Sequence, residues 1–238
     1  MHMKSFIPNG LTLLNLLMGC LAIHFVMTGF PMAVLYCLLV SAVADFFDGW
    51  AARVLDQAGN LGKELDSLAD VVSFGAVPGF MMFSTLQAGL SELSIQSSWI
   101  VPVSLLGFVI TLSSAYRLAR FNIDTRQVEG FIGLATPGNT IFFLGLYLGI
   151  HLDTFGIGHI LFNPFLLIGT IAVFSYLLNS NIHMFKLKIG KWKGHERQYI
   201  LMVLLVPLLL IMGPLGLSVI IILYILLSLL PFAETTKR

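Results

Sequence analysis

Apolar segments long enough to cross a lipid bilayer recur along the whole of this 238-residue chain. A membrane-spanning helix needs about 17 to 25 mostly apolar residues. Hydrophobic residues make up 57% of the sequence and charged residues only 11%, whereas an average soluble domain is about 25% charged. We therefore expect an all-α, polytopic bundle of membrane helices that forms a single domain over residues 1–238.

About eight helices are expected, six in a core of about residues 5–180 and two shorter ones in a C-terminal pair at about 199–230. Their approximate ranges are 10–28, 31–55, 62–88, 99–120, 137–151, 160–178, 199–212 and 215–230. The last two runs are joined at Gly213-Pro214. They could be two thin spans or one re-entrant hairpin, and either choice returns the C-terminus to the same side.

The positions of the basic residues predict how this bundle is oriented. In an eight-span arrangement, all 13 Lys and Arg residues fall on one face of the membrane. By the positive-inside rule that face is cytoplasmic, with both termini inside. The lysine-rich segment from Lys186 to Lys193 either contacts anionic lipid or only fixes the topology. A net charge of +1 does not by itself indicate a partner, and no nucleic-acid partner is expected.

Acidic residues interrupt the apolar pattern at the cytoplasmic ends of the second and third expected helices. Asp45 and Asp48 are three residues apart, and Asp66 and Asp70 are four apart, so each pair shares a helix face. The short turn at 56–60 makes the two helices antiparallel neighbours. We therefore expect the two acidic faces to meet, although each charge at membrane depth costs about 3 kcal/mol on insertion scales.

Four converging carboxylates favour hard divalent cations such as Mg²⁺, Mn²⁺ or Ca²⁺. Two such ions would balance the four acids, which is an arrangement suited to phosphoryl transfer. Arg53 would add a contact to a diphosphate, and glycines at positions 49 and 62 permit close approach of a ligand. Two alternatives stay open: the acids pair with Arg53 and Lys63, or they form the ion site of a cation-coupled transporter.

The acidic pattern resembles the signature of the CDP-alcohol phosphotransferase family. That signature reads Asp-x-x-Asp-Gly-x-x-Ala-Arg, then eight residues, then Gly-x-x-x-Asp-x-x-x-Asp. The matching positions are Asp45, Asp48, Gly49, Ala52, Arg53, Gly62, Asp66 and Asp70. The resemblance implies two divalent ions, Mg²⁺ or Mn²⁺, held by the four aspartates, with Asp70 also acting as general base. It also implies that Gly49, Ala52, Arg53 and Gly62 bind a CDP-linked lipid.

Within that family, the chain resembles the bacterial membrane-integral phosphatidylserine synthases over about residues 5–140. The resemblance lies in Ile7-Pro8-Asn9 with Thr12 and Asn15, in 65–75 with Pro78, in 117–122 and in 131–137. Ala135 departs from it, because the family more often has proline there, and we expect this to change loop stiffness rather than chemistry.

This second resemblance implies transfer of a phosphatidyl group from CDP-diacylglycerol to L-serine by a homodimer in the inner membrane, with its active site on the cytoplasmic face. Pro8, Asn9 and Thr12 are expected to border the nucleotide. Arg117, Arg120 and Asn122 are expected to bind the serine carboxylate or a phosphate, although the two arginines could instead reach anionic headgroups. Other acceptors, such as glycerol-3-phosphate or an inositol phosphate, and an ether-lipid donor remain open.

Overall fold

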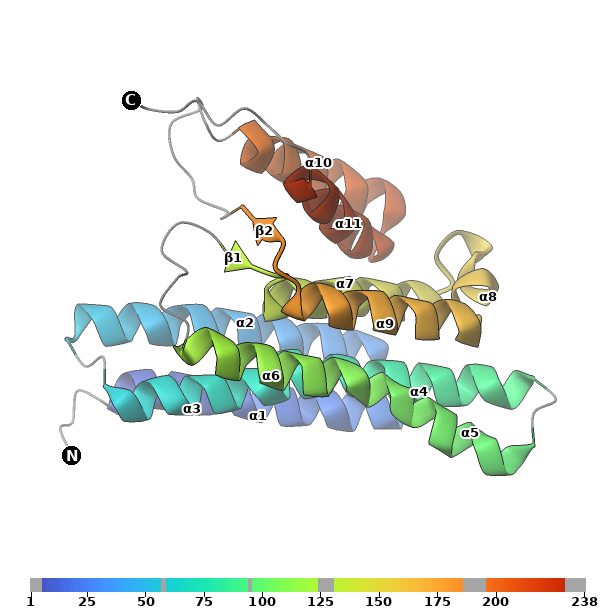
Figure 1. The fold of residues 1–238 in the computed structure, drawn as a ribbon, viewed down its shortest axis with the longest axis horizontal. Helices are drawn as coiled ribbons and strands as arrows, with labels where there is room; N and C mark the ends of the chain where they lie inside the picture. Colours follow the sequence, from blue (N-terminus) through green and yellow to red (C-terminus); the bar gives the residue numbers. More distant parts are fainter. Residues whose placement is uncertain (1–5, 57–58, 94–95, 124–130, 186–195, 230–238) are drawn as a thin grey trace.

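The computed structural model describes residues 6–56, 59–93, 96–123, 131–185 and 196–229, and these residues are largely helical (Figure 1). The first half contains α1 (Phe6–Thr28), α2 (Pro31–Val54), α3 (Asn60–Asp70), the π-helical segment η2 (Val71–Ala76), α4 (Val77–Glu92), α5 (Ser97–Ser104), the 3₁₀ segment η3 (Leu105–Phe108) and α6 (Val109–Ile123). The second half contains β1 (Phe131–Ile132), α7 (Thr136–His151), η4 (Thr154–Gly156), α8 (Gly158–Leu161), α9 (Pro164–Asn179), β2 (His183–Met184), α10 (Glu196–Met212) and α11 (Leu215–Leu229).

Four long apolar rods make up the first half of the described chain and lie side by side in Figure 1. They are α1, α2, the continuous run of α3, η2 and α4, and the continuous run of α5, η3 and α6. Each is long and apolar enough to cross a membrane. The prediction of membrane helices is confirmed here, and the third and fourth rods extend a few residues beyond the ranges expected from sequence.

Local sequence signals explain where several helices begin. Gly29, with φ of +78°, makes the turn after α1 in a backbone region that glycine enters without steric cost. Pro31 then occupies the first turn of α2, where a missing N–H costs nothing. At α9, the Asn163 side chain accepts a hydrogen bond from the backbone N–H of Phe165 at 2.9 Å, which caps the helix.

The remaining helices are shorter. α7, α9, α10 and α11 have 15 to 17 residues each, which corresponds to about 22 to 26 Å at 1.5 Å per residue, against a hydrocarbon core of about 30 Å. Most of α7 is buried by its neighbours, so it forms the interior of the bundle. The exact number of eight spans and the sides of the two termini therefore stay predictions.

The C-terminal pair, α10 and α11, lies above the rods in Figure 1 and packs through α11 onto α7. The Ser218 hydroxyl donates to the carbonyl of Phe142 at 2.7 Å across this contact. The antiparallel pairing of β1 with β2, with Phe131 opposite Met184, was not predicted from the sequence. The basic segment 186–195, Lys4, Arg126, Lys237 and Arg238 lie outside the described residues.

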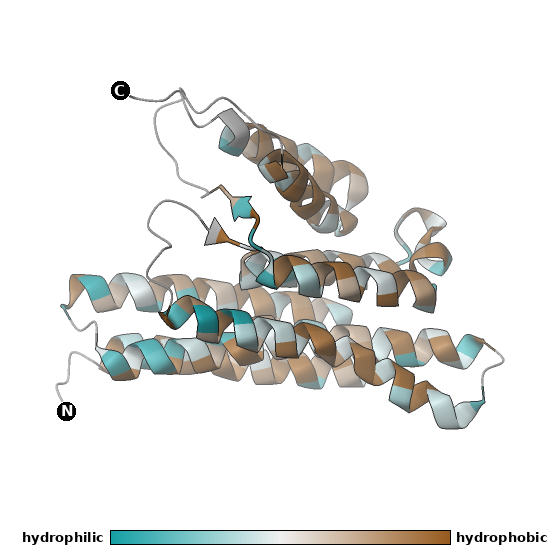
Figure 2. Cartoon of the chain, in the orientation of Figure 1, coloured by the Kyte–Doolittle hydropathy of each residue, from teal (hydrophilic) through white to brown (hydrophobic). Residues whose placement is uncertain are grey.

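Hydrophilic residues gather towards one end of the bundle (Figure 2). The end of α2, much of α3 and the last part of α6 carry hydrophilic residues at this end, and α7 begins near them. α9 runs back antiparallel to α7, so that the N–H of Leu134 donates to the carbonyl of Leu177 at 2.9 Å. The ends of α2, α3, α6, α7 and α9 therefore lie around one polar region.

Candidate active site

Four aspartates from α2 and α3 meet in this polar region. Carboxylate oxygens of Asp45, Asp48 and Asp66 lie within 4.8 Å of one another. Asp70 joins the group through a hydrogen-bond contact with Asp45. Asp48 is buried and the other three are partly buried. The structure therefore brings the two acidic faces together as their spacing predicted.

Helix α1 supplies two polar side chains to these acids. The Thr12 hydroxyl lies 2.6 Å from Oδ2 of Asp48, and Nδ2 of Asn15 donates to Oδ1 of Asp70 at 3.2 Å. Thr12 and Asn15 are three residues apart and so share one face of α1. The sequence did not predict a role for Asn15, although the three-residue spacing of Thr12 and Asn15 on a mostly apolar helix was visible in it.

A buried network fixes the orientation of the Asn15 amide. Ser41 on α2 donates its hydroxyl to Oδ1 of Asn15 at 2.5 Å, which leaves the NH₂ group for Asp70. Ser73 in η2 donates to the backbone carbonyl of Asn15 at 2.9 Å. Asn15, Ser41 and Ser73 are all 0% exposed. Asn15 is therefore held at its side chain from α2 and at its backbone from η2.

The π-helical segment η2 begins directly after Asp70. Such widened turns are rare and often occur at functional sites. The carbonyl of Phe74 accepts from Thr140 of α7 at 2.7 Å, and the carbonyl of Gly75 accepts from Thr111 of α6 at 3.1 Å. Helices α6 and α7 are therefore attached to the chain just after the last acid.

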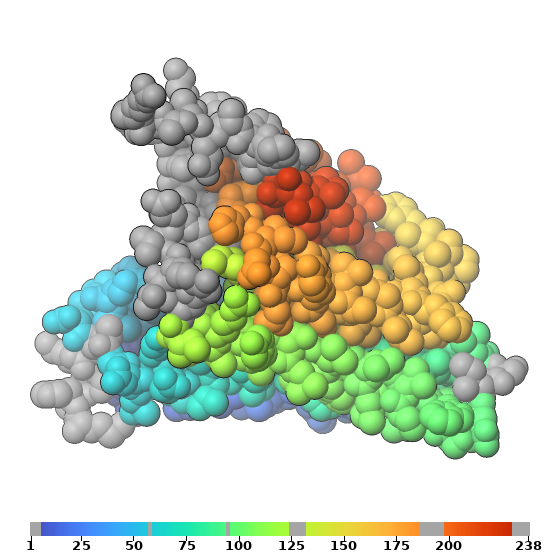
Figure 3. All heavy atoms as spheres, in the orientation of Figure 1, coloured from blue at the N-terminus to red at the C-terminus, as the bar shows by residue number. Residues whose placement is uncertain are grey.

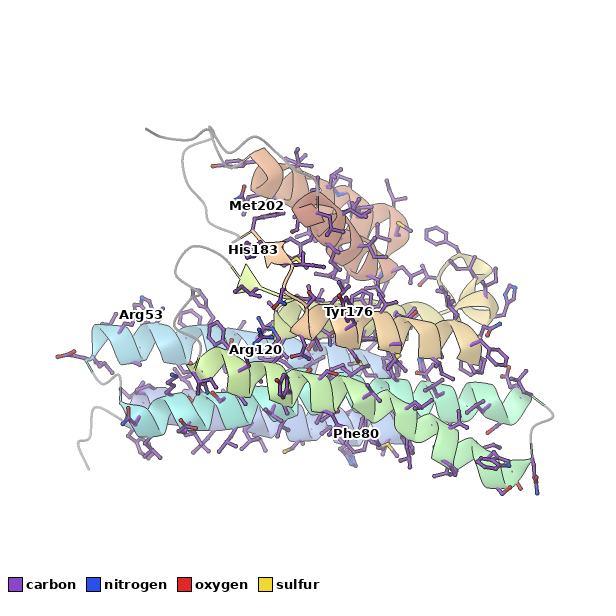
Figure 4. All side chains as sticks on the ribbon, in the orientation of Figure 1. Arg53, Phe80, Arg120, Tyr176, His183 and Met202 are labelled. Carbon is purple, nitrogen blue, oxygen red and sulfur yellow. The ribbon has the colours of Figure 1, made fainter. Side chains whose placement is uncertain are left out.

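The residues predicted to bind the CDP-lipid lie around the acids on α1, α2 and α3. A Cβ at Gly62 would lie 3.6 Å from Oδ1 of Asn9, and one at Gly49 would lie 3.5 Å from Nη1 of Arg53. The carbonyl of Pro8 accepts from Thr12 at 3.1 Å. Ala52 is partly buried, and the exposed Arg53 lies near the outer end of α2 (Figure 4).

Arg117 and Arg120 extend from α6 towards α7 and α9. Arg117 is 7% exposed, donates from Nη1 to the Thr136 hydroxyl at 3.0 Å and lies close enough to Asp70 for electrostatic attraction. Arg120 reaches the end of α9 (Figure 4) and donates to Oδ1 of Asn181 at 3.3 Å. A small pocket lies here, lined by Arg117, Arg120, Phe121, Ile132, Leu178, Asn179 and Ser180. Figure 3 shows the surfaces of α6 and α9 side by side on this face.

Asn122, predicted to lie with the two arginines, turns towards α3. Its side-chain amide donates to the Ser67 hydroxyl at 2.7 Å, and its backbone carbonyl accepts from Nζ of Lys63 at 3.1 Å. The ammonium of Lys63 is thus directed at Asn122. The alternative that Lys63 serves mainly to neutralise the acids finds no support in this contact.

The acidic group has the donor chemistry of a metal site. Its three close ligand atoms are carboxylate oxygens, which are the ligands that hard divalent cations prefer. Carboxylates this close together repel one another unless a cation or a proton lies between them. Asp45, Asp48 and Asp66 could therefore hold a divalent metal ion.

The profile of the CDP-alcohol phosphatidyltransferase family matches residues 5–178, which is more than half of the chain. The chain belongs to this family. As a CDP-alcohol phosphatidyltransferase it is a membrane enzyme, and membership gives no support to the transporter alternative. The family match ends within α9, so the C-terminal pair lies beyond it.

Curated relatives are about one third identical to this phosphatidyltransferase over the residues that align. A CDP-diacylglycerol–serine O-phosphatidyltransferase of Bacillus subtilis is 32% identical over 195 residues, which cover 82% of this chain and 95% of the relative. The protein of the same name from Mycobacterium tuberculosis is 33% identical over 60% of this chain and 49% of its own length. An archaetidylserine synthase of Methanothermobacter thermautotrophicus is 32% identical over 60% of this chain and 59% of its own length.

Proposed function

We propose that this enzyme transfers the phosphatidyl group of CDP-diacylglycerol to the hydroxyl of L-serine and releases CMP. The observation that carries the proposal is the meeting of four aspartates from α2 and α3, three with ligand atoms within 4.8 Å, beside a pocket that contains two arginines. With divalent ions bound, the first feature suits a diphosphate, and the second suits an anionic group on the acceptor. The names of the relatives support serine as the acceptor.

The bonds that change follow from the two substrates. The serine hydroxyl oxygen bonds to the phosphorus that carries diacylglycerol, and the bond from that phosphorus to the CMP oxygen breaks. CMP leaves with the electron pair. The hydroxyl proton passes to a carboxylate oxygen of Asp70, which acts as the general base. Oδ1 of Asp70 already accepts from Asn15, so Oδ2 is the oxygen proposed to take the proton.

Asp45, Asp48, Asp66 and Asp70 would hold two divalent ions, Mg²⁺ or Mn²⁺. Such ions, when bound, stabilise negative charge on the diphosphate and on the leaving CMP. The chain's own contribution is to hold the carboxylates in place, and the contact of Thr12 with Asp48 at 2.6 Å supports that role.

The donor nucleotide is proposed to lie where α1, α2 and α3 come together at the polar end. Arg53 would contact the diphosphate, while Gly49, Ala52 and Gly62 leave room for it. Asn9 lies against Gly62, which supports a nucleotide border made of Pro8, Asn9 and Thr12. The acyl chains would extend into the bilayer beside the apolar faces of the rods.

We further propose that this polar end faces the cytoplasm of the cell, at the inner membrane. Of the 13 basic residues, the described ones at this end are Arg53, Lys63, Arg117 and Arg120, and the positive-inside rule places them inside. Lipid from the inner leaflet and serine from the cytosol can both reach such a site. The eight-span topology and a homodimer remain predictions.

The proposal is tested with purified protein, CDP-diacylglycerol, Mn²⁺ or Mg²⁺, and a panel of acceptor alcohols. CMP release is expected with L-serine and not with glycerol-3-phosphate or an inositol phosphate. Release with glycerol-3-phosphate and none with serine would refute serine as the acceptor while leaving the chemistry in place. A parallel arm with an ether-linked CDP-lipid tests the donor class that the archaeal relative's name raises.

A further inference from the structure

Four buried polar atoms without hydrogen-bond partners among the described residues lie on α6, α7 and α9, and two of them belong to Arg117 and Asn179, which line the arginine-containing pocket. They are Nε of Arg117, both Oδ1 and Nδ2 of Asn139, and Oδ1 of Asn179, each without a partner among the described residues. Asn139 is 0% exposed. A buried polar group without a partner destabilises the fold, so both amide atoms of Asn139 are available to a partner that is not part of the chain.

Helix geometry places Asn139 next to Arg117. Asn139 follows Thr136 by three residues and so shares a face of α7 with it. The Thr136 hydroxyl accepts the Nη1 hydrogen bond of Arg117 at 3.0 Å. The same guanidinium presents its unpaired Nε. The unpaired amide of Asn139 on α7 therefore lies about one helical turn along α7 from the point where the guanidinium of Arg117 contacts this helix.

The packing of α7 on α9 places Asn139 behind the pocket, level with Leu178, which lines it. The ring centroids of Phe142 and Phe174 lie 3.7 Å apart in a stacked pair. The two helices are antiparallel. Asn139, one turn before Phe142 on α7, therefore lies level with Leu178, one turn after Phe174 on α9. Leu178 lines the pocket, and Asn179 follows it with its unpaired oxygen.

The four free atoms form a mixed set of two donors and two acceptors. Nε of Arg117 and Nδ2 of Asn139 are donors, while the amide oxygens of Asn139 and Asn179 are acceptors. The head of an amino acid offers a carboxylate that accepts and an ammonium that donates, so it satisfies all four. The oxygens of a phosphate dianion accept hydrogen bonds and do not donate them. A phosphate in this place would therefore leave the two amide oxygens without a donor and would put them next to a negative charge.

We propose that Asn139 selects an amino-acid acceptor by binding its zwitterionic head together with Arg117 and Asn179. The two donors bind the carboxylate, and the two amide oxygens bind the ammonium. The proposal rests on the proposed serine transfer and assigns the choice of serine over a phosphorylated alcohol to residues outside the acidic signature.

The variant Asn139→Leu tests this proposal, because leucine has a similar volume and no polar atoms. The KM for L-serine should rise about 10- to 100-fold, the effect of losing hydrogen bonds to charged groups. The KM for CDP-diacylglycerol should change by less than about twofold, within the spread of energetically neutral changes. The Tm of the serine-free protein should stay the same or rise, because a buried amide without a partner is removed. A structural role predicts the opposite change in Tm.

Ser218→Ala serves as the matched control, since Ser218 is also buried against α7 and donates to Phe142 at 2.7 Å, away from the pocket. It should lower Tm without a change in the KM for serine. An unchanged serine KM in Asn139→Leu would overturn the proposal, as would a lower Tm with both KM values altered. The proposed function is tested separately, because the acceptor panel uses the wild-type protein alone. If the wild-type protein does not release CMP with serine, the proposed function is wrong whatever the variant does.

Discussion

The side-chain amide of Asn15 donates to Oδ1 of Asp70 at 3.2 Å, from α1 to α3. Ser41 of α2 holds the other end of that amide at 2.5 Å, so three helices fix one carboxylate. Because Oδ1 accepts from Asn15, we expect Oδ2 of Asp70 to be the oxygen that receives the proton. The proposed base is therefore positioned by a helix that carries no acid of its own.

Replacing Asn15 with alanine should lower kcat about 10- to 100-fold, because a hydrogen bond to a charged group is worth about 1.5 to 3 kcal/mol. The KM for CDP-diacylglycerol should change little, since Asn15 acts through Asp70. Ser41→Ala should have a smaller effect in the same direction, because it frees the amide to rotate without removing it. Steady-state kinetics of CMP release measure both effects.

Thr28→Ala is the control for these two variants. The Thr28 hydroxyl donates to the carbonyl of His24 on the same helix, at the end of α1 opposite the acids, and its loss should leave kcat unchanged. Wild-type kcat in Asn15→Ala would show that Asp70 needs no positioning from α1.

Asp70→Asn should reduce CMP release about 100- to 10,000-fold, the usual contribution of a general base. Binding of the CDP-lipid should be largely retained, because asparagine keeps the shape of the side chain and Asp45, Asp48 and Asp66 remain. Lipid binding to the purified variant and single-turnover CMP release separate these two effects. Substantial turnover in the variant would remove Asp70 from the role of base.

Metal removal should abolish activity, and Mn²⁺ or Mg²⁺ should restore it. In the wild-type protein, added Mn²⁺ should also raise Tm, because a ligand that binds only the folded state stabilises it. Asp45→Asn and Asp66→Asn should lose most of this rise, since each removes one of the three close ligands. Glu92→Gln, an exposed position at the end of α4, should keep it. A full Mn²⁺ response in both aspartate variants would contradict the metal site.

Spacing and turn length were enough to predict that α2 and α3 bring their acids together, because a short turn leaves two helices few ways to pack. The role of Asn15 was not predicted, since its contact to Asp70 joins residues 55 positions apart and depends on how α1 packs. The π turn after Asp70 and the β1–β2 pair leave no periodic signal in the sequence. Asn122 lies in the same short segment as Arg117, yet helix rotation turns it towards Ser67, which the segment's sequence alone does not show.

The number of spans was the least predictable part of the fold. Hydropathy finds apolar runs, but α7 is apolar mainly because it is the interior of the bundle. A helix that is apolar on all sides is expected both in a protein core and in lipid, so apolar length alone does not separate the two cases.

The docking of the C-terminal pair can be tested at two glycines in comparable helix positions. A Cβ at Gly145 of α7 would lie 2.7 Å from the backbone nitrogen of Ser218, whereas one at Gly169 of α9 meets nothing within 4 Å. Gly145→Ala should therefore force α11 away from α7 and destabilise the protein by about 1 to 3 kcal/mol. Gly169→Ala should be neutral or slightly stabilising, by up to about 1 kcal/mol, because alanine favours the helix. Thermal unfolding in detergent measures both. Equal Tm values for the two variants would show that the α10–α11 pair is only loosely attached. A lower Tm for Gly145→Ala alone would show that α11 belongs to the packed core that supports the polar first turns of α7.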